Sequence, residues 1–169
     1  MKTITQKIVI SSLFAALVCV ATMIIKIPSP LKGYINLGDC IVLLSGWILP
    51  PSFGFLAAGI GSALADVFSG YMIYAPATFV IKGLMAIISY GCFALFSKKI
   101  KNFTARLLSG TLAEIVMILG YFLFEGFLYG FSPSLVNIPA NGVQGVAGLI
   151  IGIILIKIFE KQNLIKILK

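Results

Sequence analysis

The chain has 169 residues, of which 60% are hydrophobic and only 11% are charged, and its mean hydropathy is +1.10. Soluble domains carry about 25% charged residues, so this composition excludes a soluble globular fold and indicates an all-α integral membrane protein. The sequence has no histidine, which excludes histidine-based catalytic triads and metal sites. The three cysteines lie in apolar runs without metal-binding spacing, so we expect no metal and no cofactor.

Six apolar segments follow one another along the chain and predict a single six-helix membrane domain over residues 1–169. The first segment is not followed by a small-residue cleavage site, so it is interpreted as a retained helix rather than a signal peptide. Pro50 and Pro51 divide the second segment from the third, and the second is short for a bilayer that needs about 20 residues. The expected spans cover roughly residues 8–26, 37–49, 52–69, 76–97, 104–128 and 139–159.

The basic residues predict the orientation of the bundle. With the N-terminus inside, ten of the thirteen basic residues fall on the cytoplasmic side, whereas Lys26 and Lys32 fall outside and Lys82 lies within a span. This excess places both termini in the cytoplasm by the positive-inside rule. The net charge of +8 is therefore explained by topology, and we expect contact with the lipid bilayer and none with nucleic acid.

Polar side chains within the last four spans fall at one level, in the outer third of the membrane. Their depths follow from a helix rise of about 1.5 Å per residue. The residues at this level are Asp66, Lys82, Tyr121, Glu125, Asn141 and Gln144, and the outer loops add Tyr34, Asn36, Asp39 and Tyr74. We expect these ten residues to form a ligand pocket that opens to the outside.

A clasp between helices or an aromatic belt would produce the same pattern without a pocket. The polar groups within the spans could satisfy only one another as an interhelical clasp, and an interfacial aromatic belt could account for several tyrosines. Trp47, near the inner end of the second span, is expected in such a belt. Lys82 is expected to pair with Asp66 or Glu125, because an isolated ammonium within the membrane is costly.

Small side chains form a stripe along the first span. Small residues spaced by four positions let helix backbones approach closely, either within the chain or against a partner. The first span carries no charge in its interior, so it can lie outermost and face another subunit. The candidate partner-interface residues are Ser11, Ser12, Ala15, Ala16 and Cys19.

Several short motifs together resemble the substrate-binding S component of energy-coupling factor (ECF) vitamin transporters, near the riboflavin-type branch. The similarity covers nearly the whole chain. It rests on Tyr34-Ile-Asn-Leu-Gly-Asp39, Gly61-Ser-Ala-Leu-Ala-Asp66, Tyr74-Ala-Pro-Ala-Thr78 with Lys82-Gly83, Gly120-Tyr-Phe-Leu-Phe-Glu125, and Ile138-Pro-Ala-Asn141 with Gln144-Gly145.

The resemblance implies a subunit that is not an enzyme and that lies in a bacterial plasma membrane. Such a subunit captures a water-soluble vitamin or a related small heteroaromatic compound, riboflavin-like or vitamin B6-like, from outside, beneath a lid formed by the loop between the first two helices. It would hand the solute to a membrane coupling subunit and two cytoplasmic ATPase subunits. In the family an Ala-x-x-x-Ala surface of helix 1 meets the coupling subunit. Here the matching stripe is Ser11-Ala15-Cys19 or Ser12-Ala16.

Two functions of different classes compete with this interpretation. A small intramembrane enzyme could use Glu114 with Asp66 or Glu125, but the sequence has no histidine, no Gly-x-Ser-x-Gly and no phosphate-binding loop. A solitary membrane carrier would need polar groups along a path or internal repeats. The sequence shows no repeat, and the inner halves of the spans are almost purely apolar.

Overall fold

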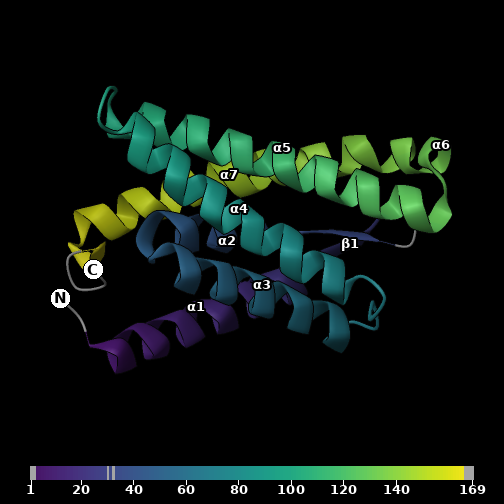
Figure 1. Ribbon diagram of the computed structural model, residues 1–169, viewed down its shortest axis with the longest axis horizontal. Coiled ribbons are helices and arrows are strands. Elements are labelled where there is room, and N and C mark those ends of the chain that lie inside the picture. The colour runs from purple at the N-terminus through teal and green to yellow at the C-terminus, as the bar shows by residue number, and fades with distance from the viewer. Residues whose placement is uncertain (1–2, 30, 32, 166–169) are drawn as a thin grey trace.

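The computed structural model describes residues 3–29, 31 and 33–165, and in these residues the chain forms an elongated helical bundle (Figure 1). The helices are α1 (Ile4–Ile24), α2 (Gly38–Ile48), α3 (Pro51–Phe68), α4 (Ala75–Phe96), α5 (Asn102–Tyr129), the one-turn α6 (Phe131–Ser134) and α7 (Ile138–Lys161). A 3₁₀ turn, Leu135–Asn137, joins α6 to α7, and two short strands, β1 (Lys26–Pro28) and β2 (Tyr34–Asn36), lie between α1 and α2.

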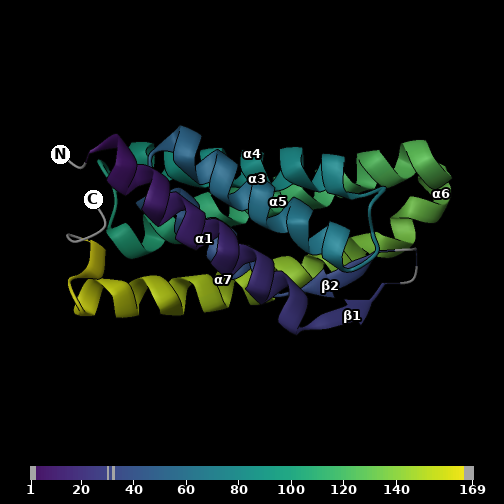
Figure 2. The same ribbon diagram turned by 90° about the horizontal axis from the view of Figure 1, so that it is seen from below.

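The predicted all-helical membrane bundle is confirmed. Five helical stretches in the described residues are long and apolar enough to cross a membrane, namely α1, α3, α4, α5 and the continuous segment Phe131–Lys161. The sixth predicted helix is α2, which has only 11 residues. The start of α1, the α4–α5 turn and the end of α7 lie at one end of the molecule, as the predicted cytoplasmic side requires (Figures 1 and 2).

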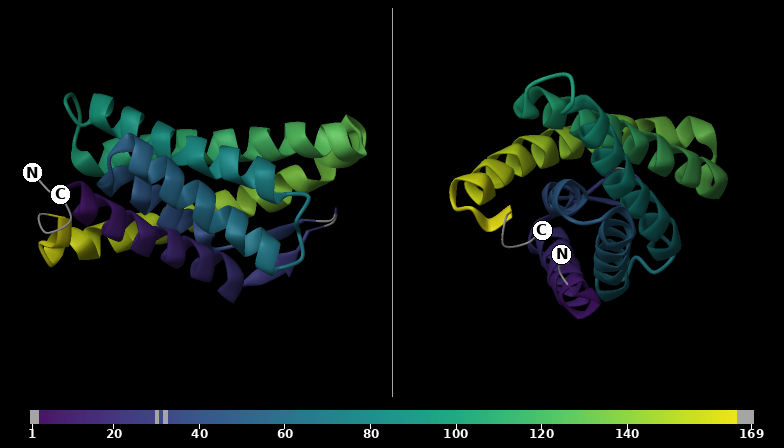
Figure 3. Two further views of the ribbon diagram at one scale, coloured as in Figure 1. Left: turned by 60° about the horizontal axis from the view of Figure 1, so that its bottom comes forward. Right: turned by 60° about the vertical axis from the view of Figure 1, so that its left-hand side comes forward.

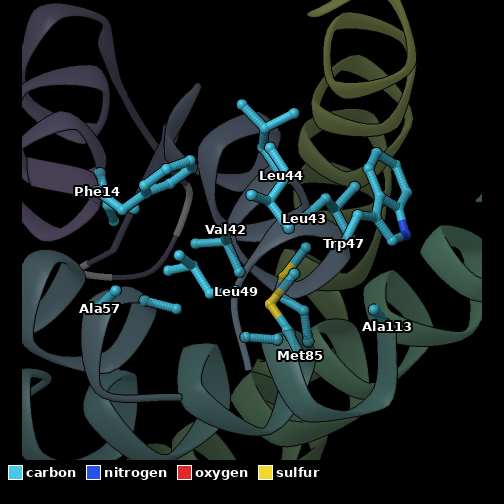
Figure 4. Packing of buried hydrophobic residues seen from close by; sticks show 14 of the residues in the cluster. Phe14, Val42, Leu43, Leu44, Trp47, Leu49, Ala57, Met85 and Ala113 are labelled. Atoms are coloured by element: carbon cyan, nitrogen blue, oxygen red, sulfur yellow. The ribbon is translucent and has the colours of Figure 1, made fainter. Parts of the chain in front are cut away.

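Helix α2 is short because it lies inside the bundle rather than along its surface. It contacts α1, α3, α4, α5 and α7, and ten of its eleven residues are buried. A helix that is apolar on all sides is typical of such a central position. Figure 4 shows Val42, Leu43 and Trp47 packed together with Met85 of α4.

Trp47 belongs to this core, so its expected place in an interfacial belt is wrong. The indole is 3% exposed, and its Nε1 donates a hydrogen bond to Ser109 Oγ over 3.1 Å. A buried indole N–H normally finds such a partner. The apolar face of the ring is therefore used for packing between α2 and α5 rather than for contact with lipid headgroups.

The segment predicted as the loop between the first two spans contains a β-hairpin at the outer end of the bundle (Figure 2). Its strands are antiparallel and pair Lys26 with Asn36, and Pro28 with Tyr34. Lys26 Nζ also donates to Ser69 Oγ, 2.9 Å away at the end of α3. The hairpin is thus fastened to the outer end of the helices.

Helix α1 lies at the side of the bundle against α3 and on the opposite side from α5 (Figure 3). Close approach depends on Gly61 of α3, where an added Cβ would collide with the carbonyl oxygen of Ala15. Much of the outward face of α1 is apolar and exposed, as a lipid-facing helix requires.

Candidate substrate-binding site

A small cavity lies at the outer end of the bundle, enclosed by the hairpin, the α3–α4 loop and four helices. Eight of the ten predicted site residues line it: Tyr34, Asn36, Asp66, Tyr74, Tyr121, Glu125, Asn141 and Gln144. Four further residues line the cavity and are not among the ten predicted ones, namely Ser29, Gly33, Tyr71 and Thr78. The remaining two predicted residues, Asp39 and Lys82, are buried but do not line the cavity.

Asp66 forms the α3 side of the cavity and is held by the hairpin. Tyr34 donates its hydroxyl proton to Asp66 Oδ1 over 2.7 Å. Burial, followed by the negative charge of Asp66, raises the pKa of Tyr34 above its ordinary value of 10.0. The phenol therefore stays a hydrogen-bond donor and joins the hairpin to α3.

Glu125 forms the α5 side of the cavity. Its Oε1 accepts hydrogen bonds from Asn137 Nδ2 over 2.8 Å and from the Tyr74 hydroxyl over 3.4 Å. Burial is the main cause that raises the pKa of Tyr74, so this group also remains a donor. Asn137 in turn accepts a hydrogen bond from the backbone N–H of Leu31 over 3.2 Å, which links Glu125 to the hairpin.

Asn137 is a buried residue of this site that sequence reasoning missed. It lies in the 3₁₀ turn between α6 and α7, within a segment predicted only as an outer loop. The chain turns back on itself after α5, and this reversal brings Asn137 beside Glu125. A single polar residue in a loop carries no periodicity, so no pattern in the sequence could have indicated this contact.

A buried ion pair lies beyond the cavity wall. Lys82 Nζ of α4 binds Asp39 Oδ1 of α2, and both side chains are almost completely buried. The expected pairing of Lys82 with Asp66 or Glu125 is therefore wrong. Asp39 lies in the first turn of α2, where the positive end of the helix dipole favours an anion, and α2 carries it to the centre of the bundle.

Gln144 of α7 connects this ion pair to the cavity. Its Nε2 donates to Asp39 Oδ2 over 2.7 Å, and its Oε1 accepts from the backbone N–H of Asn36 over 2.9 Å. The Asn36 side chain accepts from the N–H of Gly38 at the start of α2. Gln144 is thus a lining residue that also holds the hairpin and Asp39 in place.

Aromatic rings form one wall of the cavity. The ring centroids of Tyr34 and Tyr71 are 4.7 Å apart and those of Tyr71 and Tyr74 are 6.4 Å apart. Phe124, which does not line the cavity, packs against Tyr74 with ring centroids 5.3 Å apart. Tyr121 lies on α5, and its hydroxyl is 3.1 Å from Thr78 Oγ1. Such rings offer flat apolar faces together with hydroxyl groups.

The cavity is small in this structure. Its volume is about 30 Å³, and a site for one water molecule needs roughly 10–15 Å³. Pockets for small organic ligands typically measure about 300–1,000 Å³. The enclosed space therefore fits water molecules and is far smaller than a vitamin.

A separate apolar groove of about 560 Å³ runs between α1 and α3. All five predicted partner-interface residues line its α1 side, and Phe53, Leu56, Ile60, Leu64 and Phe68 lie on its α3 side. Ser12 and Ala16 are exposed, whereas Ser11 is buried and donates to the Lys7 carbonyl. The small residues thus leave a hollow that faces away from the core.

Glu114 lies apart from the outer cavity. It is 5% exposed, neither carboxylate oxygen has a hydrogen-bond partner among the described residues, and the side chain packs against Gly145 and Gly148 of α7. No group of three or more metal-binding side chains occurs in the part of the chain that the structure describes. The enzyme hypothesis, which joins Glu114 with Asp66 or Glu125, gains no support from this placement.

Comparisons with known proteins agree with this architecture. The family model "ECF-type riboflavin transporter, S component" matches residues 2–161. A Pyrococcus woesei protein described as "uncharacterized protein in gap 3′ region" is 41% identical over 136 residues, which are 80% of this chain and 88% of that protein.

Two solved structures share the fold. An S component of a bacterial ECF transporter superposes with a TM-score of 0.77 at 22% identity, covering 95% of this chain and 99% of that one. The S component for biotin from an ECF-type ABC transporter gives 0.59 at 19% identity, covering 93% and 95%. The chain belongs to the family of ECF-type riboflavin transporter S components and is a multi-pass, non-enzymatic binding subunit for vitamin uptake.

Proposed function

We propose that this S component captures its solute in the outer cavity, and that the solute is a water-soluble, riboflavin-like or vitamin B6-like heteroaromatic compound. The observation that carries the proposal is the convergence of polar and aromatic side chains from the hairpin and four helices on one enclosed space. An interhelical clasp would satisfy its own polar groups. Here Asp66 Oδ2 and Glu125 Oε2 are buried without a partner among the described residues. Unsatisfied buried acceptors at a cavity favour a ligand that brings donors.

The small volume of the cavity means that solute entry requires the outer end to open. The hairpin is the element to move, because its attachment to the helices includes hydrogen bonds that a solute can replace. Among the described residues these bonds include Tyr34–Asp66, Lys26–Ser69, Leu31–Asn137, Asn36–Gln144 and Gly38–Asn36. A solute that binds Asp66 and Gln144 would replace two of these contacts, so capture and hairpin movement would be coupled.

We further propose that the groove between α1 and α3 receives the membrane coupling subunit, which acts with two cytoplasmic ATPase subunits. The groove is almost entirely apolar and lies on the membrane-facing side of the bundle. Small side chains at its α1 edge would allow a partner helix to approach closely. The groove is separate from the solute cavity, so partner binding and solute binding can be tested independently.

The direct experiment purifies the chain in detergent and identifies copurifying small molecules by mass spectrometry. A vitamin-type heteroaromatic compound is expected at up to one molecule per chain, and calorimetry with that compound should return a single site. The variant Tyr74→Ala should lose the compound, whereas Tyr90→Ala, at a partly exposed position on α4 outside the cavity, should retain it. Equal retention by both variants would place the binding site elsewhere.

A further inference from the structure

The described lining of the cavity contains two acidic side chains and no basic one. Asp66 and Glu125 both line it, they are 4% and 2% exposed, and one oxygen of each has no hydrogen-bond donor among the described residues. Their second oxygens are held by Tyr34 and Asn137, which fixes the position of both carboxylates. One carboxyl group on α3 and one on α5 are therefore held in place, and each has one oxygen free to accept a hydrogen bond.

No basic side chain among the described lining residues balances these carboxylates. Lys82 is the cation expected here from the sequence, and it is paired with Asp39 beyond the cavity wall. Lys26 lies on the hairpin, and its ammonium group is bound to Ser69. Lys32 lies outside the described residues. The described lining thus presents to a solute two carboxyl groups with free oxygens and no basic side chain.

We infer that Asp66 and Glu125 select solutes by charge. The site takes an uncharged or cationic heteroaromatic compound that supplies at least two N–H or O–H donors, and it rejects compounds that carry a phosphate or carboxylate. An anion would lie beside two carboxylates in a poorly hydrated space, where like charges repel strongly, and it would leave their free oxygens unpaired. The tyrosine wall also favours a cationic or electron-poor ring over an anionic one. This inference rests on the proposed function of the cavity.

The test compares each solute with its own phosphate ester, so that the two members of a pair differ in one group. Riboflavin and riboflavin 5′-phosphate form one pair, and pyridoxine and pyridoxine 5′-phosphate form the second. Calorimetry on the full chain in detergent should show that the parent compound binds at least about tenfold more tightly than its ester, a difference of about 1.4 kcal/mol. The wild-type ratio needs no variant, so it does not depend on the folding of a mutant.

Variants then show whether the phosphate ester is excluded by charge repulsion or by its size. Asp66→Asn and Glu125→Gln keep the shape of the side chain and remove its charge, so each should reduce the preference for the parent over the ester. Tyr90→Phe, at a position on α4 outside the cavity, changes no charge and should leave the ratio as in the wild type. A ratio that the Asp66 and Glu125 variants do not alter would show that size excludes the ester, and it would overturn the inference.

Different results would refute the proposed function of the cavity and the inference about charge selection. If neither member of either pair binds the folded wild-type chain, the proposed solutes of this cavity are wrong. If a parent compound binds and its ester binds equally well, the cavity binds solute but does not select by charge. If the ester binds more tightly, the charge assignment is reversed and the inference is refuted.

Discussion

Replacement of Lys82 by Met is the sharpest test of the buried network. It leaves Asp39, which is 0% exposed, as a buried carboxylate without its cation. Removal of one partner of a buried ion pair typically costs about 3–5 kcal/mol. Asp39 keeps the hydrogen bond from Gln144 and its position at the start of α2, so we expect about 3 kcal/mol, at the lower end of that range. This corresponds to roughly a hundredfold change in the unfolding equilibrium.

The assay is reversible unfolding in mixed detergent micelles, followed by tryptophan fluorescence. Trp47 is the only tryptophan of the chain and lies in the core, so its signal reports loss of the bundle. Lys98→Met, at an exposed position on the cytoplasmic side, is the matched control and should change stability by less than about 0.5 kcal/mol.

A double variant completes the test. Lys82→Met combined with Asp39→Asn removes both charges and should recover much of the loss, because no unpaired ion remains buried. If Lys82→Met is no more harmful than Lys98→Met, or if the double variant is as unstable as the sum of the two single variants, the ion pair does not support the bundle. In that case the assignment of Asp39 as the partner of Lys82 would have to be abandoned.

Three further predictions concern the site and the groove. Asn141→Leu should weaken solute binding by about 2- to 13-fold and leave the stability of the chain unchanged. Gln144→Leu should reduce both solute binding and stability, because Gln144 also holds Asn36 and Asp39. Calorimetry measures solute binding, and unfolding measures stability. Ala16→Trp should disrupt copurification with the coupling subunit but preserve solute binding, and Leu13→Trp, exposed on α1 outside the groove, should preserve both. The raised pKa of Tyr34 means that the folded chain keeps the phenol proton after the unfolded chain loses it, so stability should fall as pH rises above about 10, and less steeply in Tyr34→Phe.

The sequence by itself was sufficient for the class of protein and the helical segments, and it predicts their orientation. Each residue's preference for lipid or water can be assigned from the sequence alone. Apolar runs of bilayer length and the uneven distribution of lysine can therefore be recognised without knowledge of the fold. The common depth of the polar residues was also predictable, because the rise of a helix is constant. Asp66, Glu125 and Asn141 line one cavity as that depth led us to expect, while their role in binding stays a prediction.

Only the tertiary structure decided which polar side chains pair with one another. Depth along a helix does not specify how the helix is rotated or which neighbour it meets, so Asp66 and Glu125 were the expected partners of Lys82 and Asp39 was not. The insertion of short α2 into the centre of the bundle brought Asp39 to Lys82, and this left Asp66 and Glu125 without a basic partner among the described residues. The reversal after α5 likewise placed Asn137 on Glu125. Pairing depends on distances in three dimensions between residues far apart in the chain, and only the packed bundle determines those distances.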